Sequence, residues 1–344
     1  LLPQLGAGVA QYTPFLSKNY LWVDFFFILS GFILIHVYGS TFENRTSGTD
    51  YKKYLASRFA RIYPLHLFML ALFVVLELFQ LAAFNLTDYK ELVDYKHLFA
   101  PFTHKETLWS IFTNLTLVQA FHSWTYWNEP AWSISAEWIV YLFIPLLIPI
   151  AKRLSTAVSL VGITFAYLIL LVMIEIYDDL DFASWKSIVR CLCECSVGIA
   201  LYQIYLCNYG RRLFTSPWFA NSILILTLIS LILPIHHVIT VMLFSLLILS
   251  TAYKDELVLL NHRAFIFLGT ISYSIYMTHW FIMKLTLEMS RWLSHSEFHV
   301  HFTLWRALPV LIGAVFIVIV FSKMTYSLIE NPFRQRLKRH LFSK

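Results

Sequence analysis

The chain has 344 residues, of which 58% are hydrophobic and only 13% carry an acidic or basic side chain. Soluble domains contain about 45–50% apolar and about 25% charged residues, so this composition, with its mean hydropathy of +0.65, excludes an ordinary soluble domain. The formal net charge of +6 does not indicate a nucleic-acid partner, because Lys and Arg gather in short segments between apolar runs, as membrane topology alone requires. The composition therefore indicates an integral membrane protein.

Apolar runs follow one another along the chain at 21–39, 63–83, 132–151, 155–176, 185–206, 217–235, 237–252, 265–289 and 304–328. Their length is close to the ~20 residues that a helix needs to cross a bilayer, rather than that of short alternating membrane strands. We therefore expect an all-α fold, a polytopic transmembrane helical bundle with about nine spans. The segments between the runs alternate in charge, and the basic ones, including the carboxyl-terminal tail, are expected on the cytoplasmic side.

Nine spans place Leu1 outside the membrane and Lys344 inside. The chain starts without Met or a cleavable signal pattern, and a polytopic protein without a signal more simply begins inside. Parity thus predicts a further span before Leu1, and residues 1–344 are expected to form a single membrane domain that lacks its first helix. The one long loop, 84–131, is expected on the outer side, with its short apolar part Trp109–Phe121 as an interfacial or re-entrant segment.

Three of the four cysteines, Cys191, Cys193 and Cys195, form the sequence CLCEC inside an apolar run. Their spacing is helical and does not match that of a metal knuckle, so they are expected to be small buried residues. We predict no metal site.

The stretch WSISAEWIVY, from Trp132 to Tyr141, places one carboxylate inside a membrane-length run. Ser133 and Tyr141 lie four residues on either side of Glu137, so a helix brings all three to one face. An ionisable residue within the membrane is costly and by default marks a functional site. The alternative is a structural acid neutralised by a proton or by a neighbouring hydroxyl.

Arginines and small residues mark two further stretches. Arg58 and Arg61 are three residues apart in RFARIYPLH, where a chain enters the membrane from the cytoplasm. They are either an ordinary basic flank or a guanidinium pair for phosphate groups. In WVDFFFILSGFILIH, Asp24 lies near the outer end of a span, and Ser30 with Gly31 allows close approach of a backbone or a ligand.

A polar stripe lies in GTISYSIYMTHWFIMK, where Ser272, Tyr276 and His279 fall on successive turns of one helix face. Lipid cannot satisfy such a stripe, so it must face the bundle interior or a cavity. His279 is a candidate general base, and the alternative is a histidine satisfied by a neighbouring hydroxyl.

Five of these motifs occur together and in order. They are FFFILSGF at 25–32, RFARIYP at 58–64, WSISAEW at 132–138, ISYSIYMTHW at 271–280 and IENPFR at 329–334. This arrangement resembles the membrane-bound acyltransferase type-three family, which O-acetylates bacterial surface polysaccharides, in its stand-alone form without a fused hydrolase domain. The resemblance implies acetyl transfer from cytoplasmic acetyl-CoA to a hydroxyl of a glycan or lipid-linked glycan, in the bacterial inner membrane, with no permanently bound cofactor.

The resemblance also implies roles for the singled-out residues. Glu137 and His279 would be catalytic. Arg58 and Arg61, with Ser30 and Tyr63, would bind the acyl donor. The residues implied for the acceptor are Trp132, Ser133, Tyr141, Ser272 and Tyr276. Members of the family carry an Arg and a His ten residues apart in their first helix, which this chain does not show, so the chain alone is expected to transfer little.

A different class of function is compatible with the same residues. A proton-coupled transporter of acylated sugars or small organic acids would use Glu137 as a proton relay. The Arg58/Arg61 pair discriminates between the two, because an acetyl-CoA site needs it and a proton-coupled carrier does not.

Overall fold

The computed structural model describes residues 18–43, 46–86, 102, 106–122, 127–178, 180, 184–253, 262–294 and 304–342. Within these ranges every regular element is helical, as the sequence predicts. The elements are η1 (Asn19–Leu21), α3 (Trp22–Tyr38), α4 (Gly48–Leu86), α6 (Leu108–Leu115), η2 (Gln119–Phe121), α7 (Ala131–Ala151), α8 (Thr156–Tyr177), α9 (Trp185–Leu206), α10 (Arg211–Phe214), α11 (Pro217–Ile232), α12 (His237–Tyr253), α13 (Arg263–Thr270), α14 (Ser272–Ser294), α15 (Leu304–Thr325), the π-helix η4 (Tyr326–Glu330) and α16 (Asn331–Phe342).

The predicted count of nine spans is not confirmed. Six helices of the described residues are long and apolar enough to cross a membrane, or seven if the bent pair α13–α14 is one span. That pair bends by 68° between Thr270 and Ser272. The remaining two predicted spans are α11 and α12, with 16 and 17 residues. At a rise of ~1.5 Å per residue such helices fall short of the ~30 Å hydrocarbon core.

Helix α4 corrects a second expectation. The segment before residue 63 is not a loop, because the helix starts at Gly48 and continues for 39 residues. Arg58 and Arg61 therefore lie on the same helix as the span that follows them. Pro64, the second residue of the apolar run 63–83, lies inside the helix.

The predicted outer loop contains a short helix, in line with the expected interfacial segment. Helix α6 is capped by Thr107, whose hydroxyl oxygen accepts a hydrogen bond from the Ser110 amide at 3.2 Å. Its residues Leu108, Trp109 and Phe112 are exposed. Parts of this loop, at 87–101, 103–105 and 123–126, lie outside the described residues, as does the predicted first segment up to residue 17.

The described chain falls into two compact units. One comprises Lys53–Ser135 and Phe267–Lys344, and the other comprises Leu2–Lys52 and Ala136–Ile266. The chain passes between the units within helices α4, α7 and α13. The single membrane domain remains a prediction, and each unit is described by itself below.

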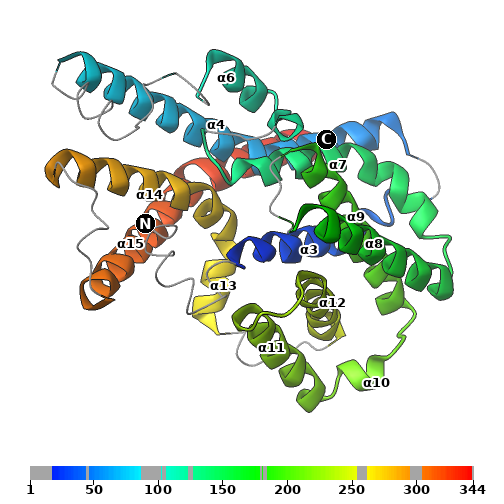
Figure 1. Cartoon of the computed structure of the whole chain (residues 1–344). Helices are drawn as coiled ribbons and strands as arrows, with labels where there is room; N and C mark the ends of the chain where they lie inside the picture. Colours follow the sequence, from blue (N-terminus) through cyan, green and yellow to red (C-terminus); the bar gives the residue numbers. More distant parts are fainter. Residues whose placement is uncertain are drawn as a thin grey trace. The chain divides into compact units, whose positions relative to one another are not determined.

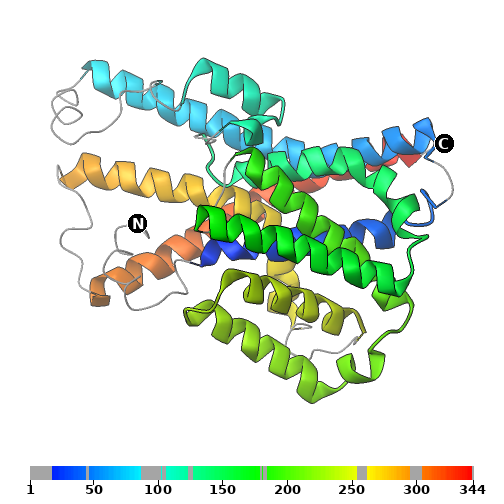
Figure 2. The same ribbon diagram turned by 45° about the vertical axis from the view of Figure 1, so that its right-hand side comes forward.

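In the second unit, α3 and α9 pack at very close range (Figure 1). A Cβ atom on Gly31 would lie 2.1 Å from the Cys195 carbonyl oxygen, and one on Gly198 would lie 2.0 Å from the Ile28 carbonyl oxygen. Only glycine therefore fits at either position, and the small-residue motif of α3 is a packing notch for α9. Helix α8 packs on α9, and α11 lies beside α12 (Figure 2).

Proline shapes the end of α7 in the same unit. Pro149 has no N–H, so the Pro145 carbonyl four residues earlier lacks its helical partner. The Thr46 hydroxyl donates to that carbonyl at 3.0 Å, and the Tyr51 hydroxyl donates to the Leu142 carbonyl at 2.9 Å. The segment before α4 is thereby held against α7.

In the first unit, α14 packs on α15 and α4. The Tyr273 hydroxyl donates to the Ile62 carbonyl at 2.6 Å, and the ring of Phe281 meets that of Phe73 edge-on. A hydrogen bond of 2.7 Å joins the hydroxyls of Thr278 and Ser322. These contacts fix the face of α14 that carries the predicted polar stripe.

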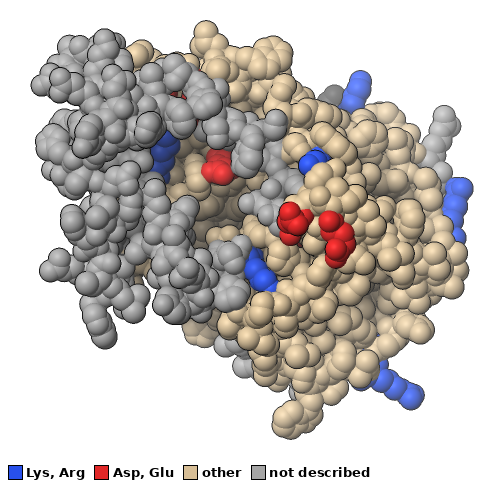
Figure 3. All heavy atoms as spheres, in the orientation of Figure 1, with Lys and Arg blue, Asp and Glu red and all other residues tan. Residues whose placement is uncertain are grey.

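The surface is that of a membrane protein. The face in Figure 3 shows few acidic or basic side chains among its described residues. Large apolar side chains are exposed along the long helices, such as Phe79 on α4 and Phe165 on α8, at 68% and 64%. So many exposed apolar side chains fit a lipid environment rather than water.

Candidate active site

The carboxylate of Glu137 is held by hydroxyl groups from two helices. Ser30 of α3 donates to its Oε1 atom at 2.7 Å, and Tyr141, one turn further along α7, donates to the same oxygen at 2.5 Å. Glu137 and Tyr141 thus lie on one face of the helix, as their spacing predicts, and are hydrogen-bonded there. Ser30 was expected to face an acyl donor, but its hydroxyl lies on Glu137.

The position of Glu137 leaves it accessible. Its side chain is half-buried, whereas Ser135 and Ala136 beside it are fully buried. Among the described residues, both hydrogen bonds to this carboxylate reach Oε1, so Oε2 is the oxygen able to accept a proton from a substrate. This arrangement suits a general base.

Ser133 bonds to groups other than Glu137. Its hydroxyl lies 2.7 Å from the Tyr276 hydroxyl and 3.0 Å from the Pro130 carbonyl, to which Tyr276 also donates at 2.8 Å. The three groups form a closed triangle in the first unit. Ser133 and Glu137 lie on the same helix at the predicted spacing, and the serine hydroxyl contacts Tyr276 of α14. The neighbouring Trp132 is buried.

The polar stripe of α14 lies on one helix, as predicted. The Ser272 hydroxyl donates to the Gly269 carbonyl at 2.9 Å, across the bend between α13 and α14. The Nδ1 atom of His279 lies 3.2 Å from the Ile275 carbonyl, and its ring is 5.9 Å from that of Tyr276. A carbonyl only accepts, so Nδ1 carries the proton and Nε2 of the neutral ring keeps its lone pair. His279 thus presents a base nitrogen.

The arginine pair stands on α4, near a buried acid. Arg61 is exposed, Arg58 is half-buried, and the Tyr63 hydroxyl donates to the Leu115 carbonyl at 3.0 Å. Glu330 of η4 is only 3% exposed; it accepts from the Ser274 hydroxyl at 2.8 Å and pairs with Arg334 at 3.9 Å. Glu330 thus pairs with an arginine of the tail helix α16, and Arg61 adds a further favourable charge.

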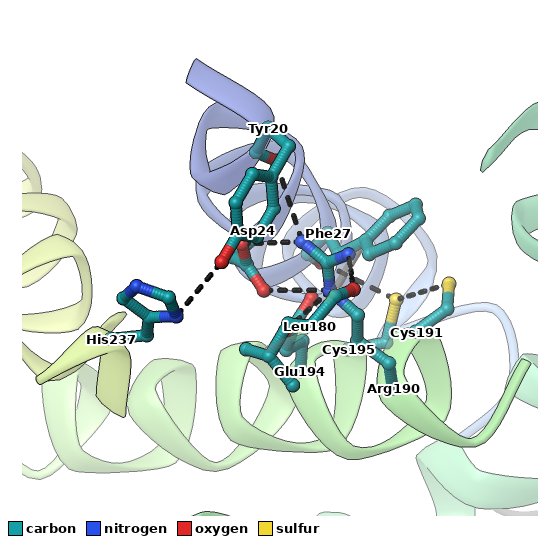
Figure 4. A network of polar contacts seen from close by, with 9 residues as sticks. All are labelled: Tyr20, Asp24, Phe27, Leu180, Arg190, Cys191, Glu194, Cys195 and His237. Atoms are coloured by element: carbon teal, nitrogen blue, oxygen red, sulfur yellow. Dashed lines mark hydrogen bonds and ion pairs between the residues drawn. The ribbon is translucent and has the colours of Figure 1, made fainter. Parts of the chain in front are cut away.

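A buried ion network in the second unit was missed by the sequence analysis. Arg190 of α9 donates from Nε to Asp24 Oδ1 at 2.9 Å and from Nη2 to Asp24 Oδ2 at 2.6 Å, and from Nη1 to the Leu180 carbonyl (Figure 4). Glu194 lies one turn further along α9, 3.6 Å from Arg190 Nε. The sequence does contain a signal for this network, because Arg190 and Glu194 are four residues apart inside an apolar run. Only the cysteines in this stretch were considered in the sequence analysis.

Comparison with known proteins gives two matches. The family model described as "Acyltransferase domain" (Acyl_transf_3) matches residues 16–323. A protein of Rhizobium radiobacter, "Protein 2 in picA locus", is 38% identical over 129 residues, covering 36% of this chain and 63% of that protein. The chain thus spans less than two thirds of this relative. No solved structure matches the chain significantly.

The resemblance seen in the five motifs is therefore confirmed by a model that covers most of the sequence. The membrane-length helices and the carboxylate held within them agree with it. The chain belongs to this acyltransferase family and is a multi-pass membrane member of it.

Proposed function

We propose that this chain is a membrane O-acyltransferase that moves an acetyl group from cytoplasmic acetyl-CoA to a hydroxyl of a cell-surface or exported glycan. The acceptor is a glycan or lipid-linked glycan, the bilayer is the bacterial inner membrane, and the carboxyl terminus faces the cytoplasm. Family membership supports the reaction class. The observation that carries the proposal is the half-buried Glu137 carboxylate, which sits within a membrane-length helix and receives two hydroxyl hydrogen bonds.

In the proposed reaction Glu137 is the general base. The acceptor oxygen attacks the thioester carbonyl carbon, a C–O bond forms, the C–S bond breaks, and CoA leaves as its thiolate. The hydroxyl proton passes to Glu137 as the new bond forms, and such assistance contributes roughly 10²–10⁴-fold to a rate. Ser30 and Tyr141 orient the carboxylate and stabilise its negative charge through their hydrogen bonds.

His279 is the second proposed acid–base residue. Its Nε2 lone pair is available because Nδ1 donates to the backbone of its own helix. A neutral imidazole with one fixed nitrogen accepts or returns a proton near neutral pH. Trp132, Ser133, Tyr141, Ser272 and Tyr276 are proposed to contact the acceptor.

The acyl donor is proposed to bind along α4. Arg61 is exposed and one turn from Arg58, so both guanidinium groups can reach the phosphates of CoA, a geometry that suits arginine better than lysine. The hydroxyl groups of Tyr63 and Ser30 already donate hydrogen bonds within the protein. The acyl donor would therefore contact the ring of Tyr63 or the lone pairs of the Ser30 oxygen.

Two measurements test this proposal. Binding of acetyl-CoA to the purified protein should weaken at least tenfold in Arg58→Ala and Arg61→Ala, and should be unchanged in Arg211→Ala and Arg212→Ala, which remove exposed arginines of α10. Mass spectrometry of surface glycans should show acetyl groups that depend on the gene. Equal acetyl-CoA binding by all four variants would refute the donor site, and unchanged glycan acetylation in cells lacking the gene would refute the acceptor class.

A further inference from the structure

Three charged side chains meet inside the pairing of α3 with α9. Asp24, Arg190 and Glu194 each have 0% of their surface exposed. Two carboxyl groups face one guanidinium, so full ionisation would leave a net negative charge in a site without water contact. The proposed acyl transfer uses none of the three.

Arg190 is directed at Asp24. Its Nε and Nη2 atoms form the two-pronged contact with the Asp24 carboxylate, and its Nη1 donates to the Leu180 carbonyl. The Nε atom stands 2.9 Å from Asp24 but 3.6 Å from Glu194, which is too long for a hydrogen bond. Asp24 therefore holds the guanidinium by hydrogen bonds, whereas Glu194 contacts it only as a longer ion pair.

Glu194 lacks the partners that an ionised carboxylate needs. Both of its oxygens are buried, and neither receives a hydrogen bond from the part of the chain that the structure describes. A carboxylate with no water and no donor is strongly disfavoured in protein interiors. As a neutral acid, in contrast, Glu194 can donate its proton to the carboxylate of Asp24, because both acids lie against the same Arg190 nitrogen.

The hydroxyl and thiol groups around this site bond to groups other than Glu194. The Tyr167 hydroxyl of α8 bonds to Ser245 of α12, and the Tyr20 hydroxyl of η1 bonds to His237 of α12 at 2.8 Å. The Cys195 thiol of α9 donates to the Phe27 carbonyl of α3 at 3.3 Å. The Cys191 thiol, one turn before Cys195 on α9, lies 4.0 Å from the Cys195 sulfur atom. None of these groups donates a hydrogen bond to Glu194.

We propose that Glu194 is a proton-binding residue, held as a neutral carboxylic acid whose proton is donated to Asp24. The site then contains one Arg190–Asp24 ion pair and one acid proton, with no net charge. It fastens α3 to α9 six residues before Ser30, and so fixes the position of the serine that bonds to Glu137. The ligand of this site is a single proton, bound as a carboxylate becomes a carboxylic acid.

Infrared spectroscopy of the purified full chain at neutral pH tests this inference without any acyl-transfer assay. The carbonyl stretching band of a protonated carboxylic acid should be present in the wild type and lost in Glu194→Gln, and it should shift when ¹³C-labelled glutamate, but not labelled aspartate, is incorporated. Glu175→Gln, which removes a glutamate with 69% side-chain exposure, should leave the band intact. Failure of acyl transfer would therefore not affect this result.

The proposal places a neutral hydrogen-bond donor at position 194, and glutamine is a neutral donor of the same shape. Glu194→Gln should therefore fold as well as Glu175→Gln. Three results would overturn the proposal: a protonated-acid band that persists in Glu194→Gln, a band that follows labelled aspartate, or a Glu194→Gln protein that does not fold.

Discussion

The hydroxyl of Ser30 lies 2.7 Å from Oε1 of Glu137, although 107 positions separate the two residues. This bond connects two of the family's motifs. In the small-residue motif of α3, Gly31 allows α9 to pack closely, and Ser30 donates a hydrogen bond to the Glu137 carboxylate of α7. Helix packing and site geometry are therefore set by neighbouring residues of one helix.

Ser30→Ala should slow acyl transfer by about tenfold or more. A hydrogen bond to a charged group contributes ~1.5–3 kcal/mol, and ~1.4 kcal/mol corresponds to a factor of ten in rate. Steady-state kinetics checks this, because a serine that positions Glu137 should lower kcat. A raised KM for acetyl-CoA with unchanged kcat would instead indicate that Ser30 contacts the donor. Ser30→Thr keeps the hydroxyl and should retain more activity than the alanine variant.

Gly31→Ala and Gly198→Ala should destabilise the protein. The added methyl group would meet backbone oxygen atoms of the facing helix, and overpacking of this kind costs about 1–3 kcal/mol or more. Gly162→Ala on α8 is the matched control, since nothing lies within 4 Å of its added Cβ. Alanine is favoured over glycine within a helix by about 0.5–1 kcal/mol, so the control should gain stability. Thermal unfolding in detergent measures whether each variant loses or gains stability. Equal changes of the unfolding temperature at the three positions would contradict the packing account.

Lys18→Met should destabilise the end of α11. The Lys18 ammonium, 5% exposed, donates to the carbonyls of Ser230, Leu233 and Ile235 at 3.1, 2.8 and 2.6 Å. A cation suits a helix carboxyl end, and its hydrogen bonds contribute about 1.5–3 kcal/mol or more in total. Lys152→Met is the control, because Lys152 pairs with the exposed Glu43, and such surface ion pairs contribute little to stability. An unfolding temperature that drops equally in both variants would count against the contact.

The sequence predicted those features that depend on neighbouring residues. Apolar runs predicted the long helices, and the spacing of Glu137 and Tyr141 predicted that they share one helix face, where the structure shows a hydrogen bond between them. The predicted run begins at residue 63, whereas α4 begins at Gly48. The Lys and Arg residues before 63 are typical of a loop between spans, but such residues also suit a helix that extends beyond the membrane.

Features that depend on tertiary packing were not predictable from spacing. Ser133 lies on the face of Glu137 by periodicity, yet its hydroxyl bonds to Tyr276, 143 residues away. Arg190 and Asp24 are separated by 166 positions, and only the packing of α3 on α9 brings them together. The sequence shows that charges are buried, and the fold decides which of them meet.

The most direct test of the proposed function is acetyl transfer by Glu137→Gln. The variant keeps the shape of the side chain but removes the base, so we expect transfer per folded protein to fall by roughly 10²–10⁴-fold. Glu175→Gln, on the exposed end of α8, should transfer acetyl groups at the wild-type rate. Measurement of labelled acetyl groups moved from acetyl-CoA to surface glycan compares the three proteins. Transfer by Glu137→Gln at the rate of Glu175→Gln would contradict the assignment of Glu137 as the base.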